Sequence, residues 1–157
     1  MKPNIVLETP LPKEVSLQLL NNAAIKTFEL TKLEVIGNIH LAIVNKGQSK
    51  KLNAQFAGNN YATDVLSFAY ETANSLNELK VPQAKAEIVI CLPIARQQAM
   101  EYSIDLSSEV VLLFVHGLLH VLGCDHQNNN DKASFESLQN DIIKSLDLNT
   151  RKMKWLH

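Results

Sequence analysis

The stretch from Val110 to Leu122 is apolar almost without interruption, yet it contains two histidines, His116 and His120. A helix that is apolar all round packs in the interior of a protein, so this stretch is expected to be the central helix of the fold. Residues four apart lie one above the other on a helix, so the two imidazoles share a face and can hold one ion. A buried polar group needs a partner. The stretch therefore predicts a metal site at the end of a buried helix.

A third histidine, His126, follows Gly123, a residue that can end the helix and turn the chain back. Three imidazoles with an open fourth position are typical of a catalytic zinc site rather than a closed structural one. We therefore predict that His116, His120 and His126 bind one Zn²⁺ per chain. The sequence does not identify a general base or any other catalytic residue.

The residues between the helix and the third histidine leave two questions open. Cys124 as a fourth ligand would close the site, but adjacent side chains on a tight turn rarely all point inward, so this alternative is less favoured. Asp125 is expected either to orient a ligand histidine or to bond local backbone in the turn.

The spacing H-x-x-x-H-x-x-G-x-x-H is also that of metzincin proteases, in which a glutamate after the first histidine serves as general base. Gly117 occupies that place here. Glycine cannot take a proton, which counts against peptide hydrolysis. Two explanations of Gly117 stay open: a neighbouring segment packs closely against it, or the missing side chain leaves room beside the ion.

Length and composition are those of one ordinary globular domain, assigned to residues 1–157: 46% of the residues are hydrophobic and 20% are charged. The net charge of −1 does not indicate a polyanionic partner for the whole surface, and we expect neither DNA nor a membrane. The two cysteines, Cys91 and Cys124, form no CxxC pattern, which fits a reducing compartment. No secretory signal is recognisable at the N-terminus. The sequence thus predicts a cytoplasmic protein.

Periodicity and turn residues predict strands and helices in alternation. Strands are expected over residues 5–7, 39–44, 64–70 and 87–92. Helices are expected over residues 13–30, 49–57 and 94–102, from a cap at Ser107 or Ser108 to Gly123, and over 131–146. The strand at 87–92 is nearly all apolar and is expected to be central. This order indicates an α+β single domain with a mixed four-stranded β-sheet covered by helices.

With the histidine motif in place, the chain resembles the YbeY family of bacterial endoribonucleases and ribosomal RNA maturation factors. Further segments carry the resemblance: Leu52-Asn53, the string Ala62-Thr-Asp-Val-Leu-Ser-Phe68, the strand Ala86-Glu-Ile-Val-Ile90 and the following Ala95-Arg-Gln-Gln-Ala99. The matching blocks occur in family order and span residues about 40–146.

The resemblance implies a zinc ion held by the three histidines and an endoribonuclease of the single-strand type. It also implies a role in 3′-end maturation of small-subunit (16S) ribosomal RNA and in ribosome quality control, with ribosomal RNA and the ribosome or its proteins as partners. The alternatives are a non-catalytic, zinc-containing ribosome assembly factor and a zinc hydrolase of another substrate class.

Two positions depart from the family pattern. Where the family has an arginine followed by Gly, Lys and Asp, this chain reads Ala57-Gly-Asn-Asn60, and that arginine is thought to matter for RNA cleavage. Glu87 replaces the usual aspartate and keeps its charge. Lys50, Lys51 and Arg96 are the nearest candidates to replace the missing guanidinium.

Two local basic groups are candidates for RNA contacts, although each is more simply read as solvated surface. They are Lys46 with Lys50 and Lys51, and Arg151 with Lys152, Lys154 and Trp155. His40 is expected to be an ordinary surface or packing histidine and His157 to be solvated. Asp64 is expected either to point into the cleft or to cap its strand.

Overall fold

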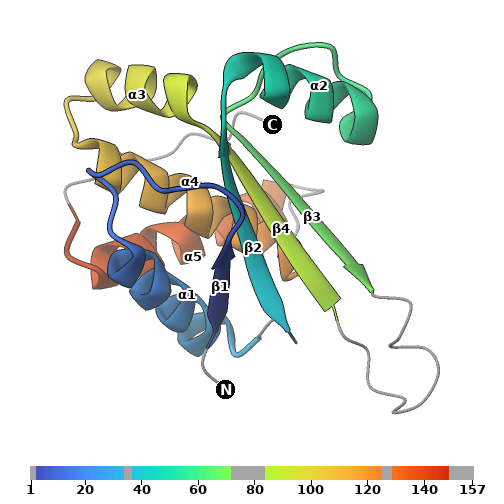
Figure 1. The fold of residues 1–157 in the computed structure, drawn as a ribbon. Helices are drawn as coiled ribbons and strands as arrows, with labels where there is room; N and C mark the ends of the chain where they lie inside the picture. The colour runs from blue at the N-terminus through green and yellow to red at the C-terminus, as the bar shows by residue number, and fades with distance from the viewer. Residues whose placement is uncertain (1–2, 34–36, 72–83, 125–128, 149–157) are drawn as a thin grey trace.

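The computed structural model describes residues 3–33, 37–71, 84–124 and 129–148 (Figure 1). The strands in these ranges are β1 (Asn4–Leu7), β2 (Asn38–Val44), β3 (Val65–Glu71) and β4 (Ala84–Cys91). The helices are α1 (Leu17–Thr31), α2 (Lys46–Ala57), α3 (Leu92–Glu101), α4 (Leu106–Val121) and α5 (Asn129–Ser145). Their order along the chain is the order that the sequence predicts.

The strands form one mixed sheet with the spatial order β1-β2-β4-β3. β1 and β2 are parallel, as are β2 and β4, whereas β3 pairs with β4 in the antiparallel sense. β4 therefore lies inside the sheet, as its nearly all-apolar segment at 87–92 predicted. The predicted fold class, an α+β domain with a four-stranded mixed sheet covered by helices, is confirmed.

The core lies between one face of this sheet and the helices α1, α4 and α5 (Figure 1). The residues of β2 and β4 that point into it have no exposed surface: Ile39, Leu41, Ala86, Ile88 and Ile90. α4 contacts α1, α3, α5, β3 and β4. All side chains from Val110 to Val115 are completely buried. The apolar histidine-containing segment is thus the central helix of the fold.

α2 and α4 start earlier than predicted because a capping residue lies further upstream than expected, whereas α1 starts later than predicted, at Leu17, after the N-cap Ser16. α2 begins three residues early, because Asn45 and Gln48 form a reciprocal capping box. The prediction of Ser107 or Ser108 as the cap of α4 was wrong: the Asp105 carboxylate accepts from the backbone N–H of Ser108 at 2.8 Å. Asparagine and aspartate are strong N-caps because they accept such a bond with little strain.

The predicted end of α4 agrees with the structure, since Gly123 has φ +81° just beyond the helix. This left-handed conformation is easy for glycine and strained for other residues. Within the described ranges, no single helix has the length and apolar character needed to cross a bilayer. α3 and α4 reach that length and apolar character only when they are taken together as a pair, and the chain bends by 116° between them.

Candidate metal centre and its pocket

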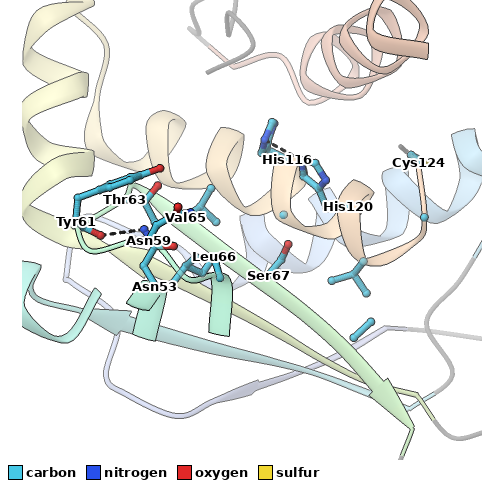
Figure 2. Close-up of a pocket in the computed structure, with 15 residues that line it drawn as sticks. Asn53, Asn59, Tyr61, Thr63, Val65, Leu66, Ser67, His116, His120 and Cys124 are labelled. Carbon is cyan, nitrogen blue, oxygen red and sulfur yellow. Dashed lines mark hydrogen bonds between the residues drawn. The ribbon is translucent and has the colours of Figure 1, made fainter. Parts of the chain in front are cut away.

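His116 and His120 lie side by side on α4, as their four-residue spacing predicts (Figure 2). Their ring centroids are 4.8 Å apart, and the two Nε2 atoms are separated by 3.2 Å. Two nitrogen ligands of a tetrahedral zinc ion, each about 2.0–2.1 Å from the metal, lie about 3.3 Å from one another. The pair therefore has the spacing that two ligands of one ion require.

Gln139 fixes the orientation of the first histidine. Its Oε1 atom, on α5, lies 2.8 Å from Nδ1 of His116. An amide oxygen can only accept, so His116 donates from Nδ1 and the neutral ring keeps the lone pair of Nε2 turned toward His120. Both partners of this bond are 1% exposed. Phe135 adds an apolar wall, with ring centroids 5.3 Å from His116 and 5.1 Å from His120.

The third predicted ligand, His126, and its neighbour Asp125 lie outside the described residues, so the predicted His116–His120–His126 set is brought together only in part. Among the residues that the structure describes, no three His, Cys, Asp or Glu side chains gather closely enough to hold an ion. Cys124 therefore does not complete a three-ligand site with the histidine pair. Burial raises the pKa of the Cys124 thiol above its ordinary value.

The histidine pair opens on a pocket of about 660 Å³ between α4, β3 and the end of α2 (Figure 2). This volume is typical of ligand sites. Polar side chains line it at several points, and the Ser67 hydroxyl lies on the histidine side of β3 (Figure 2). The lining residues include Asn53, Ala57, Asn59, Tyr61, Thr63, Ser67, His116, Gly117, His120 and Cys124.

No lysine or arginine is among the described residues that line this pocket. Ala57, the position of the missing arginine, does line it. Arg96 instead bonds Glu14, with Nη1 and Oε2 2.7 Å apart, and this bond lowers the pKa of the Glu14 carboxyl. Lys50 and Lys51 are exposed on α2 outside the lining. None of the three candidate substitutes therefore reaches the pocket in this structure.

Gly117 is explained mainly by close packing. A Cβ atom at this position would lie 3.2 Å from Cγ2 of Ile88 and 3.4 Å from Cγ2 of Val65. The glycine thus allows α4 to lie directly against β3 and β4, and its backbone forms part of the pocket wall. A side chain at this position would require Ile88, which is completely buried, to shift by a few tenths of an ångström.

Two other singled-out residues have structural roles. Asp64 is buried; its Oδ1 accepts from the backbone N–H of Val65 at 2.8 Å, and its Oδ2 accepts from Gln98 at 3.3 Å. It is not among the pocket-lining residues, so the capping interpretation holds. His40 bonds the Glu8 carboxylate through Nδ1 on the face of the sheet away from α4, which agrees with an ordinary surface histidine. The groups at Arg151–Trp155 and His157 lie outside the described residues.

Gln139 was not among the predicted site residues, although its sequence context carries a signal. Among the α5 side chains that the structure describes, residues 133–145, the buried ones are spaced at helical intervals: Phe135, Gln139, Ile142 and Ile143. A lone amide within such an apolar stripe needs a buried partner. His116 is that partner.

A histidine pair that faces a pocket, with one ring buried and oriented by an amide, is the kind of arrangement that metal-dependent hydrolases use. Comparison with known proteins identifies the family. The profile described as Endoribonuclease YbeY matches residues 7–147. The chain therefore belongs to the YbeY family.

Relatives and a solved structure agree with this assignment. An Endoribonuclease YbeY of Polynucleobacter asymbioticus is 33% identical over 129 residues, which cover 82% of this chain and 79% of that protein. One from Desulforamulus reducens is 32% identical over 150 residues, covering 92% and 98%. The solution structure of TM1509 from Thermotoga maritima has a TM-score of 0.56 at 24% identity, covering 91% of this chain and 87% of that one, and it supports the fold alone.

Proposed function

We propose that this protein is a zinc-dependent endoribonuclease that matures the 3′ end of small-subunit (16S) ribosomal RNA and takes part in ribosome quality control in the cytoplasm. Membership in a family of endoribonucleases supports hydrolysis of phosphodiester bonds in RNA. The observation that carries the metal dependence is the separation of 3.2 Å between Nε2 of His116 and Nε2 of His120 at the pocket wall. Ribosomal RNA and the ribosome or its proteins are the proposed partners.

In this proposal His116, His120 and His126 hold one zinc ion. Zinc in such a site supplies a Lewis acid that stabilises charge on a phosphate oxygen and acidifies a water molecule. Gln139 keeps the proton of His116 on Nδ1, so the Nε2 lone pair stays directed at the ion. Phe135 excludes water from one side of the two rings. Ser67, on the pocket wall beside the histidine pair, can donate a hydrogen bond to a phosphate or a ribose.

The test is an assay of purified protein on a single-stranded RNA that carries the 3′ end of a small-subunit precursor. We expect cleavage that a chelator abolishes and one equivalent of zinc restores. Casein serves as the control substrate, because Gly117 supplies no general base for peptide hydrolysis. Cleavage that persists without metal would contradict the zinc dependence, and zinc-dependent casein cleavage would contradict the substrate class.

A second candidate, a non-catalytic assembly factor whose zinc rigidifies the fold, is favoured by one observation. The described lining of the pocket contains no lysine or arginine, the residues that usually bind phosphate. In that case the purified protein would contain zinc and bind ribosomal RNA or a ribosomal particle without cutting it. The same assay, scored for both binding and cleavage, separates the two functions.

Replacing Gln139 by alanine is expected to weaken zinc binding by roughly 10- to 100-fold, the usual effect of removing a group that orients a ligand histidine. The Nδ1 proton of His116 would lose its acceptor, so the other tautomer would compete for the ring. Zinc affinity is measured by competition with a fluorescent chelator. Gln139→Glu, which keeps an acceptor at the same place, serves as the matched variant and should bind zinc more tightly than the alanine variant. Equal affinity in all three proteins would contradict an orienting role for Gln139.

A further inference from the structure

The end of the pocket near α2 is formed by the short segment that joins α2 to β3. Gly58 ends α2 with φ +74°, and the chain then passes through Asn59 and Tyr61 before it enters the strand. Both Asn59 and Tyr61 line the same pocket as the histidine pair. The segment thus adds an amide and an aromatic ring to a site otherwise lined mainly by α4, β3 and α2.

Asn53 holds this segment in one conformation. Its backbone oxygen accepts from the N–H groups of Gly58 and Asn59, the latter at 3.2 Å. Its side-chain Nδ2 donates to the backbone oxygen of Tyr61 at 2.9 Å (Figure 2). Asn53 itself is only 2% exposed, so each of these bonds has one buried partner. The backbone that carries Tyr61 is therefore fixed before any ligand binds, which lowers the entropic cost of binding.

The ring of Tyr61 remains accessible, since the residue is 55% exposed although its backbone is held. Tyr61, Thr63, Val65 and Ser67 follow one another along the pocket toward the histidine pair (Figure 2). Val65 lies beside α4 at Gly117, where an added Cβ atom would be 3.4 Å from Cγ2 of Val65, and four residues of extended chain span at most about 14 Å. The ring is thus within reach of a nucleic-acid strand whose phosphate backbone lies at the histidine pair.

We propose that Tyr61 is a stacking platform for the base of an unpaired nucleotide next to the phosphate at the histidine pair. This inference rests on the proposed function, because it takes single-stranded RNA as the occupant of the pocket. An exposed tyrosine ring stacks on any base, and proteins that read single-stranded RNA use aromatic residues in this way. Asn59, beside the ring on the pocket wall, offers an amide that can donate to and accept from a base edge.

The chemistry of this end of the pocket favours a base over a second phosphate. The described lining residues here are asparagines, a tyrosine and a threonine, without a cation to bind a phosphate group. Thr63 already donates to Asp64 at 3.3 Å and is 8% exposed, so the ring and the amide of Asn59 are the groups presented to a ligand. Contacts of this kind select unpaired over paired RNA, because a base must leave its helix to stack on the ring.

The experiment measures the affinity of the full chain for a fluorescein-labelled single-stranded RNA of ten nucleotides by anisotropy. Tyr61→Ala is expected to weaken binding by about 5- to 100-fold, the range found for loss of one base–aromatic stack. Tyr61→Phe keeps the ring and should stay within about twofold of the unmodified protein, on the same stacking argument. The matched control is Tyr102→Ala, which removes a tyrosine that is 46% exposed outside the pocket and should leave the affinity unchanged.

A second RNA of the same length without bases isolates the stack. On this abasic strand the unmodified protein and Tyr61→Ala should bind equally. Equal binding of the two proteins to the base-containing strand, or an equal loss on both strands, would overturn the proposal.

Cleavage of the same RNA is scored separately. Binding that depends on Tyr61 but is not followed by cleavage would support the stacking platform and contradict the proposed nuclease activity. Cleavage together with an unchanged affinity in Tyr61→Ala would support the nuclease activity and contradict the stacking platform.

Discussion

Replacing His120 by alanine is expected to reduce the zinc content of the purified protein from about one ion per chain to nearly none. Zinc bound by four protein ligands contributes about 10–16 kcal/mol, so one ligand is worth roughly 3 kcal/mol, or about two orders of magnitude in affinity. His120 is the cleanest position to change, because it faces the pocket and is partly exposed, so its loss leaves no sealed cavity. Mass spectrometry of the metal content after dialysis measures the effect.

His116→Ala should lose zinc as well, together with some stability. This ring is 1% exposed and packs against Phe135, so its removal leaves a cavity and an unpaired amide at Gln139. The melting temperature separates the two effects, since His120→Ala should change it less once metal has been removed from all proteins. His126→Ala is expected to behave like His120→Ala and tests the third ligand.

His40→Ala is the matched control for these variants. His40 bonds Glu8 on the face of the sheet away from the histidine pair, so its loss should leave the zinc content at one per chain. Full zinc content in the triple variant of His116, His120 and His126 would reject the ligand assignment. A loss of zinc in His40→Ala would show that metal content reports general damage to the fold.

The sequence predicted best those parts of the molecule in which local pattern and burial agree. Val110–Val115 is apolar on every side and is completely buried, and the segment Ile88–Cys91 of β4 is apolar throughout and lies inside the sheet. The contact of His116 with His120 follows from helix geometry alone, because a four-residue spacing is a property of the helix and not of its surroundings. These features needed no information about distant segments.

The parts that were missed depend on residues far apart in the chain. Gln139 is 23 positions from His116, and only the packing of α5 on α4 brings them together. The tight contact that explains Gly117 is likewise made by Ile88 and Val65 from two strands. The upstream cap of α4 was missed because Asp105, Ser107 and Ser108 all suit the role and only the backbone geometry decides among them.

Position 57 is both a departure from the family pattern and a part of the pocket lining. Ala57 is the last residue of α2, is exposed and lines the pocket of the histidine pair. An arginine is a good helix former and is favoured at the carboxyl end of a helix, where it complements the dipole. Ala57→Arg should therefore fold as well as the unmodified protein. Its guanidinium would be the first cation on the described part of the pocket lining.

Ala57→Arg is expected to raise the rate of RNA cleavage by about 10²- to 10³-fold without changing the zinc content. A charge-assisted donor that binds a phosphate near the reacting centre typically contributes ~2.7–4 kcal/mol to transition-state stabilisation. Single-turnover cleavage of the precursor RNA measures the rate. Gln55→Arg is the matched control, since it adds the same charge to α2 about 160–200° around the helix from Asn53 and Ala57.

Rapid cleavage by the unmodified protein, at the same rate as by Ala57→Arg, would show that this chain does not need a guanidinium at position 57. An equal gain in both arginine variants would assign the effect to general attraction of RNA instead of a contact in the pocket.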